Sequence, residues 1–105
     1  MQEFKGTPGP WVASKSDRSI GPVIRDDDQS YGMILPVAWV EFDPEVEIQA
    51  ANHQLIAAAP ELLEALQDAE KALFAALDNA FGEEMANGNR ELIQARAAIA
   101  KALGQ

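Results

Sequence analysis

The chain has no cysteine among its 105 residues, which excludes a disulfide framework, a thiolate metal site and a cysteine nucleophile. It also has no uninterrupted apolar run of about 18 residues, the length that a membrane-spanning helix needs. Residues 1–5 lack the apolar core of a signal peptide. We therefore expect a cytosolic protein that does not insert into membranes.

Basic residues are few: eight lysines and arginines stand against seventeen acids, giving a net charge of −9. The imbalance is spread along the chain, because residues 1–45 carry four bases and eight acids, and residues 46–105 carry four bases and nine acids. Such a chain repels phosphate backbones, so we expect no direct nucleic-acid binding. The acidity has two explanations. It can maintain solubility, or it can mimic a nucleic acid towards a DNA-binding partner.

The size and composition indicate one globular domain spanning residues 1–105. Hydrophobic residues make up 48% of the chain and charged residues 24%, as in ordinary folded proteins. Residues 1–43 are punctuated by glycine and proline and contain short β-branched and aromatic runs, whereas residues 44–105 are rich in alanine and leucine. This change predicts an α+β fold, with a three-stranded antiparallel meander followed by three helices.

Three segments have the composition of strands: residues 11–14, 21–25 and 33–42, with a polar turn at residues 16–19. Pro36 interrupts the third segment and cannot donate to a ladder, so it places this strand at an edge or a bulge. Alternation along the strand predicts that its second, wholly apolar face packs against the helices. That face consists of Ala38, Val40 and Phe42.

The helix boundaries are marked by residues with known terminal preferences. Asp43 is the expected N-cap of the first helix, and Pro60 ends that helix and begins the second. Gly82 ends the second helix, and the third runs from a cap at Asn89 to Gly104. The buried stripe expected for the first helix is Ile48, Ala51, Leu55 and Ile56.

The second helix carries two adjacent apolar stripes, a face wider than one neighbouring helix normally covers. We therefore expect self-association into a homodimer, in which the second and third helices of two copies form a four-helix arrangement. The expected interface residues are Leu66, Leu73, Phe74, Leu77, Phe81, Leu92 and Ile99.

Catalytic chemistry has little support in the sequence. His53 is the only histidine, and no recognisable spacing supplies it with a nucleophile or carboxylate. We expect His53→Ala to leave folding and binding nearly unchanged. The acidic run 26–28 lacks the spacing of a calcium loop and is interpreted as a solvated turn. No cofactor, metal or enzymatic activity is expected. Trp11 and Trp39 are interpreted as core residues, or alternatively as contacts to a ligand or partner.

Two segments carry a family resemblance. Residues 7–11 (Thr-Pro-Gly-Pro-Trp) and residues 51–63, which include the run Leu-Ile-Ala-Ala-Ala-Pro-Glu-Leu-Leu, resemble small phage and prophage accessory proteins. The pattern is similar to the Ead-like early proteins of lambdoid phages. The resemblance implies a nonessential phage factor that acts in the host bacterial cytosol by modulating host physiology or defence through protein contacts.

These observations favour a non-catalytic phage accessory protein that acts as an oligomeric binding module on a host protein. One alternative is an inhibitor of a bacterial defence system, acting by acidic mimicry or by occluding an effector. Another is a sponge that sequesters a small signalling molecule in an intersubunit pocket built around Trp11 or Trp39.

Overall fold

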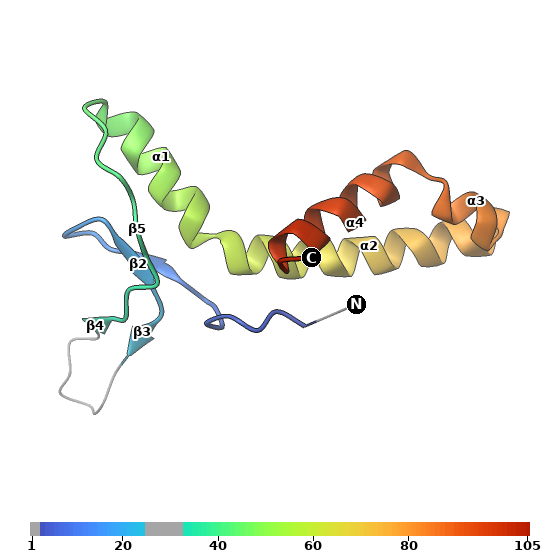
Figure 1. Ribbon diagram of the computed structural model, residues 1–105, viewed down its shortest axis with the longest axis horizontal. Coiled ribbons are helices and arrows are strands. Elements are labelled where there is room, and N and C mark those ends of the chain that lie inside the picture. Colours follow the sequence, from blue (N-terminus) through green and yellow to red (C-terminus); the bar gives the residue numbers. More distant parts are fainter. Residues whose placement is uncertain (1–2, 25–32) are drawn as a thin grey trace. The chain divides into compact units, whose positions relative to one another are not determined.

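The computed structural model of the chain describes residues 3–24 and 33–105 (Figure 1). The chain divides into two compact units, one of residues 6–61 and the other of residues 62–105 with the start of the chain. The described strands and the first helix belong to the first unit, and the second unit is helical. The α+β class predicted from the sequence is confirmed.

The first unit contains two small antiparallel sheets. Strands β1 (Val12–Ala13), β2 (Ser19–Gly21) and β5 (Ala38–Trp39) form one, in the order β1-β2-β5. Strands β3 (Val23–Ile24) and β4 (Met33–Ile34) form the other. The predicted meander is therefore present in outline, but its second and third strands are each divided into two. The second also begins earlier than expected, since Ser19 belongs to β2 and not to a turn.

The division follows from a bulge next to Pro36. Ile20 pairs with Ala38, and the C=O of Ile20 also accepts a hydrogen bond of 2.8 Å from the N–H of Val37. Two residues of one strand thus oppose one residue of the other, which defines a β-bulge. The sequence-based prediction of an edge or bulge at Pro36 is confirmed.

Helix α1 (Val46–Ala57) packs against β1 and β2 and closes the core of this unit. The buried cluster contains Ile20, Val40 and Ala57, with Trp11, Ala13 and Ala38 packed against it. Ala38 and Val40 therefore face inward as predicted. The same prediction is wrong for Phe42, which is exposed because the strand has ended before it.

The face of α1 that contacts the sheet differs from the predicted one. Ile48, Ala51, Leu55 and Ile56 are all exposed. The less exposed positions are instead Gln49, His53 and Ala57, which are spaced four residues apart and so share one side of the helix. The helix also begins two residues later than predicted, with Glu45 at its N-cap, and Asp43 Oδ1 accepts from the N–H of Glu45 at 2.8 Å.

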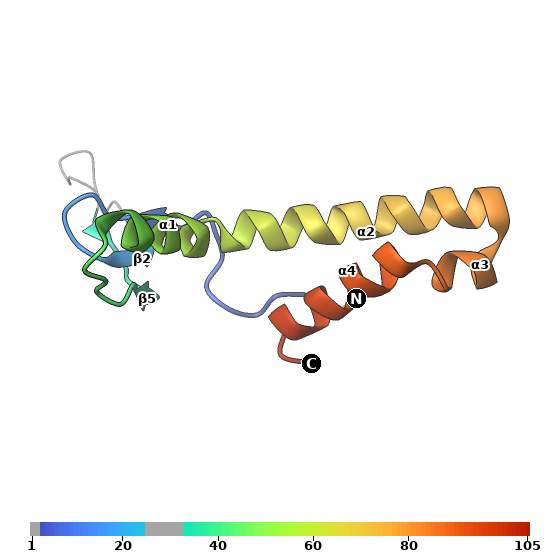
Figure 2. The ribbon, with the colours of Figure 1, turned by 90° about the horizontal axis from the view of Figure 1, so that it is seen from above.

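The second unit is a helical hairpin. Helix α2 (Ala59–Phe81) is followed by the short helix α3 (Glu83–Asn87) and by α4 (Arg90–Ala102). Figures 1 and 2 both show α4 running back alongside α2 after the turn at α3. The side chains of Ala86, Leu92 and Ile99 are buried in this hairpin.

The predicted helix boundaries agree well with the structure. The break at Pro60 is confirmed, because α1 ends at Ala57 and α2 begins at Ala59. Gly82 follows α2 with a φ of +90°, a conformation that favours glycine. Asn89 caps α4, since its Oδ1 accepts from the N–H of Leu92 at 2.9 Å. The five-residue α3 was not predicted.

Candidate functional site

The opening segment, residues 7–11, lies against the end of α1. The indole N–H of Trp11 donates to the carbonyl oxygen of Thr7 at 3.2 Å, which closes this segment into a tight loop. Gly9 lies so close to Pro60 that a Cβ at Gly9 would be 2.6 Å from Pro60 Cβ. The two segments that carry the family resemblance are therefore neighbours in space.

Beside this junction is an open pocket with a volume of about 470 Å³. That volume lies within the range of small-molecule sites. Strand β1 and its flanks form one wall, and the end of α1 with the start of α2 forms the other. The lining residues are Trp11, Val12, Ala13, Lys15, Gln54, Ala57, Ala58 and Glu61.

The chemistry of this pocket suits a mixed apolar and polar group. Trp11 offers an aromatic surface, while Lys15, Gln54 and Glu61 provide one cation, one amide and one anion at the rim. The sequence identified Trp11 as a candidate contact, and the structure places it in the pocket wall. It did not identify Lys15, Gln54 or Glu61, because they come from segments about 40 residues apart and no motif joins them.

His53 links α1 to the sheet. Its Nε2 lies 3.0 Å from the backbone carbonyl oxygen of Ser19, and because a carbonyl only accepts, Nε2 is the donor. The Ser19 hydroxyl donates to Asp17 Oδ1 at 2.6 Å. In an activated serine the hydroxyl instead donates to the imidazole. His53, Ser19 and Asp17 therefore form a structural network. Its hydrogen bonds do not follow the serine-to-histidine-to-aspartate sequence of a catalytic triad.

The same network shifts the ionisation of Asp17. Hydrogen bonds from the hydroxyl and backbone N–H of Ser19 lower the pKa of the Asp17 carboxyl, with smaller contributions from Ser14 and from the charge of His53. Hydrogen bonds to a carboxylate favour its ionised form. Asp17 is therefore an acceptor that holds the turn before β2.

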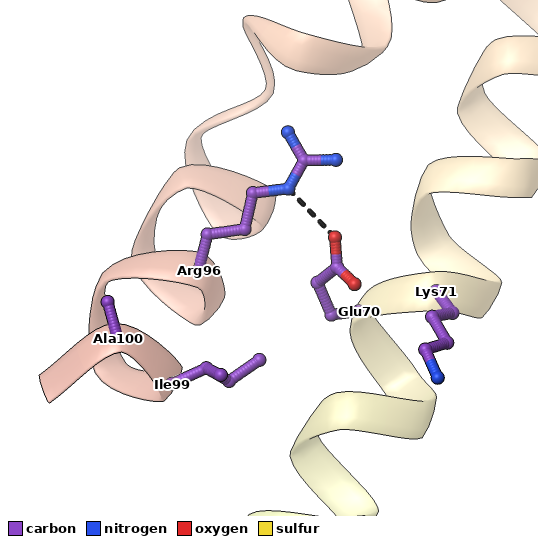
Figure 3. Close-up of a pocket in the computed structure, with 5 residues that line it drawn as sticks. All are labelled: Glu70, Lys71, Arg96, Ile99 and Ala100. Carbon is purple, nitrogen blue, oxygen red and sulfur yellow. Dashed lines mark hydrogen bonds and ion pairs between the residues drawn. The ribbon is translucent and has the colours of Figure 1, made fainter. Parts of the chain in front are cut away.

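In the second unit, a buried carboxylate joins α2 to α4 (Figure 3). Glu70 is only 5% exposed, and its Oε1 accepts from Arg96 Nε at 2.8 Å. The Arg96 guanidinium also donates to Asn87 Oδ1 at 2.8 Å and lies 5.2 Å from the centre of the Phe74 ring. Figure 3 shows Arg96 directed towards Glu70, and Lys71 pointing away from the pair.

A second open pocket, of about 460 Å³, lies at this ion pair. Glu70, Lys71, Arg96, Ile99 and Ala100 line it. The charges of Glu70 and Arg96 are already paired with each other. The pair therefore positions the two helices relative to each other. Lys71 is the cation of this pocket that does not take part in the ion pair.

The structure divides the predicted interface residues into three groups. Leu92 and Ile99 are 0% and 1% exposed, so they belong to the core of a single hairpin. They lie on α4, which folds back alongside α2 and buries them there. Phe81 is 65% exposed. The others, which are partly exposed, are Leu66, Leu73, Phe74 and Leu77.

Two further exposed apolar residues of the second unit were not predicted from the sequence. Met85 is 67% exposed and Ile93 is 53% exposed. Met85 belongs to α3, which was not predicted. Ile93 follows the buried Leu92 directly, and two adjacent apolar residues on a helix point in different directions. The adjacent pair Leu92 and Ile93 was therefore the feature of the sequence from which an exposed apolar residue could have been predicted.

Trp39 is 60% exposed, so its interpretation as a core residue is wrong, whereas Trp11 does pack against the core. The acidic run 26–28 lies outside the described residues. Within the described part of the chain, no group of three or more potential metal ligands is found. No helix there combines the length and apolar character needed to cross a membrane.

Comparison with known sequences gives a match over the whole chain, residues 1–105, to the family described as Salmonella phage P22 protein Y8K6. The chain belongs to this phage protein family. The phage setting implied by the resemblance is thereby supported, while the finer likeness to Ead-like early proteins remains a hypothesis. No curated protein matches the chain, and no solved structure does.

Proposed function

We propose that this chain is a non-catalytic phage accessory protein of the Ead-like kind, acting in the host cytosol as an oligomeric binding module on a host protein. Its phage family supports the setting. The observation that carries the binding role is the amount of apolar surface beside a small core. Among the described residues of the first unit, the buried hydrophobic cluster has three members, while exposed apolar residues lie on β3, β4, β5 and α1.

Uncovered apolar surface also supports a homodimer of helical hairpins. Helix α2 has 23 residues and α4 has 13, corresponding to lengths of about 34 and 20 Å, so α4 cannot cover the full length of α2. Phe81, Met85 and Ile93 are exposed, and burying such side chains contributes roughly 1.5–3 kcal/mol each. A twofold pairing of hairpins would cover them and the partly exposed leucines of α2.

A host protein as the partner is tested by affinity capture with the full chain, followed by mass spectrometry and reconstitution with the purified candidate. A stoichiometric complex that is reconstituted from two pure proteins supports the binding module. If no host protein is retained by a folded, dimeric sample, the binding role is contradicted.

A second candidate function is favoured by the Trp11 pocket. Its volume of about 470 Å³ and its aromatic wall suit a small signalling molecule, which the protein would sequester. Purified protein that carries a nucleotide or similar compound through chromatography, and loses it in Trp11→Ala, would favour this function. Inhibition of a defence system, by acidic mimicry or by occlusion, is the special case in which the captured host protein belongs to such a system.

A further inference from the structure

Strand β5 is at the edge of the three-stranded sheet. The strand order β1-β2-β5 places it there, and Figure 1 shows it beside β2. Among the residues that the structure describes, no strand pairs with the outer side of β5. An edge of this kind presents backbone groups that another chain can use.

The register determines which backbone groups face outward. The N–H of Val40 donates to the C=O of Arg18 at 2.9 Å, so the backbone N–H of Val40 faces β2. Trp39 pairs with Ser19, and hydrogen-bonded and non-hydrogen-bonded pairs alternate along an antiparallel ladder. Ser19 uses its C=O on the other side, accepting from Ser14 N–H at 3.0 Å. The N–H and C=O of Trp39 therefore both point to the open edge.

The side chains around this edge are apolar and exposed. Trp39 projects from the sheet face opposite the buried Ile20 and Val40, and Leu35 and Val37 before it are also exposed. No charged residue occurs between positions 35 and 40, although edge strands are commonly protected by lysine or other charges. Pro36 lacks a backbone N–H but lies before β5 begins, so the backbone of Trp39, the last residue of β5, stays accessible.

The charge of this unit limits what can bind there. Residues 6–61 carry nine acids and three bases, and Glu41 and Asp43 follow β5 directly. A second copy of the same edge would bring two acidic units together, whereas a basic segment would be attracted. The backbone groups of Trp39 require an extended chain, and its side chain requires an apolar neighbour.

We propose that the β5 edge binds an extended, apolar and basic segment of the host partner by β-augmentation. The segment pairs with the backbone of Trp39, places an apolar side chain on the Trp39 ring and directs basic residues towards Glu41. This inference rests on the proposed binding function and names the surface and the kind of partner segment involved.

The direct test uses a nine-residue synthetic peptide with blocked ends, which has valines at its centre to contact Trp39 and lysines at both ends to reach Glu41. The full-length ¹⁵N-labelled chain is titrated with it, and hydrogen exchange of the Trp39 amide is followed by NMR. The control is the same peptide with its three central amides N-methylated, which removes backbone donors and keeps the side chains. We expect slowed exchange at Trp39 and about tenfold weaker binding of the methylated peptide, as expected for one or two lost hydrogen bonds. Equal binding of the two peptides, or unchanged exchange at Trp39, would overturn the inference.

Protein variants provide a second test. Trp39→Pro removes the outward N–H without removing a bond to β2, so the sheet should tolerate it; we expect about tenfold weaker peptide binding. Trp39→Ala separates the side-chain contribution, and Val12→Ala on the opposite edge strand is the matched control with unchanged binding. Circular dichroism monitors folding. If Trp39→Pro unfolds, the inference is tested only by comparing the binding of the unmodified peptide with that of the N-methylated peptide.

The inference and the binding function can fail separately. If a reconstituted host protein binds the wild type and Trp39→Pro equally well, the edge is not its binding surface, and the binding function stands. If the peptide result holds but no host protein is retained, the binding function fails while the edge is confirmed. If Trp39→Pro abolishes self-association of the chain, the occupant is a second copy, and the inference of a host segment is wrong.

Discussion

Gly9 and Pro60 are in van der Waals contact across the first unit, and the contact leaves no room for a side chain at Gly9. A Cβ there would lie 2.6 Å from Pro60 Cβ and 3.1 Å from Pro60 Cγ. The opening segment is thereby held at the break between α1 and α2. It also forms one side of the pocket that contains Trp11.

The first prediction is that Gly9→Ala destabilises the protein. The added methyl group must displace the Pro60 ring or the backbone, and overpacking of this kind costs about 1–3 kcal/mol. Gly88→Ala is the control, because its Cβ would have only ordinary contacts at 3.7 Å. Urea denaturation measures the free energy of unfolding of both variants. Equal stability of the two variants would contradict the close contact at Gly9.

The second prediction concerns His53, where the structure indicates a larger effect on stability than the nearly unchanged folding expected from the sequence. His53→Ala removes the bond from Nε2 to the Ser19 carbonyl, and losing such a bond costs about 0.5–1.5 kcal/mol. Asn52→Ala, at the exposed neighbouring position of α1, is the control. Thermal denaturation followed by circular dichroism compares the two. If His53→Ala has the same melting temperature as the wild type, the contact between His53 and Ser19 contributes nothing to stability.

The third prediction is a pH dependence from Asp17. Because Ser19 lowers the pKa of this carboxyl in the folded state, folding is favoured when Asp17 is ionised. Its contribution is complete above the unfolded-state pKa of about 4 and is lost as the pH falls through the folded-state pKa. Asp17→Asn should therefore reduce the loss of stability below about pH 4. The free energy of unfolding of the wild type and of Asp17→Asn is measured from pH 6 to pH 2.5. If it falls equally for both proteins over this range, the prediction is refuted.

The fourth prediction concerns the ion pair between the buried Glu70 and Arg96, whose side chain is 39% exposed. Arg96→Met leaves the carboxylate of Glu70 buried without its partner, which should cost about 1–3 kcal/mol of stability. The double variant Glu70→Met with Arg96→Met should recover most of that loss, because apolar residues often replace a buried pair without penalty. Denaturant titration measures the free energy of unfolding of the single and the double variant. A double variant that is no more stable than Arg96→Met alone would contradict the penalty assigned to the unpaired carboxylate of Glu70.

The sequence predicted those features that depend on local chemistry. Pro60, Gly82 and Asn89 act within one helical turn, and each marks a boundary that the structure confirms. The bulge beside Pro36 was also predictable, because proline lacks the N–H that a regular ladder needs.

The orientation of α1 was not predictable, because apolar residues occur on more than one side of this helix. Ile48 and Leu55 suggested a buried stripe, yet both are exposed. The helix is oriented in part by the bond between His53 and Ser19, which are 34 residues apart. No local pattern encodes such a contact. The sequence identified Trp11 but missed the polar residues of its pocket for the same reason, since Lys15, Gln54 and Glu61 meet only in the folded chain.

Phe81 is the residue at which the proposed dimer is tested by substitution. It is exposed in the single chain, so Phe81→Asp should leave the hairpin folded and remove apolar contact between copies. Val23→Thr, in the sheet, should leave the oligomer intact. Size-exclusion chromatography with light scattering compares the variants. A Phe81→Asp protein that stays dimeric would place the interface elsewhere.

The most direct measurement is sedimentation equilibrium of the unmodified chain at high micromolar concentration. Pairing of helical hairpins predicts a species of twice the chain mass of 11.3 kDa, dissociating on dilution according to a single constant. A well-behaved monomer throughout this concentration range would contradict the oligomeric binding module.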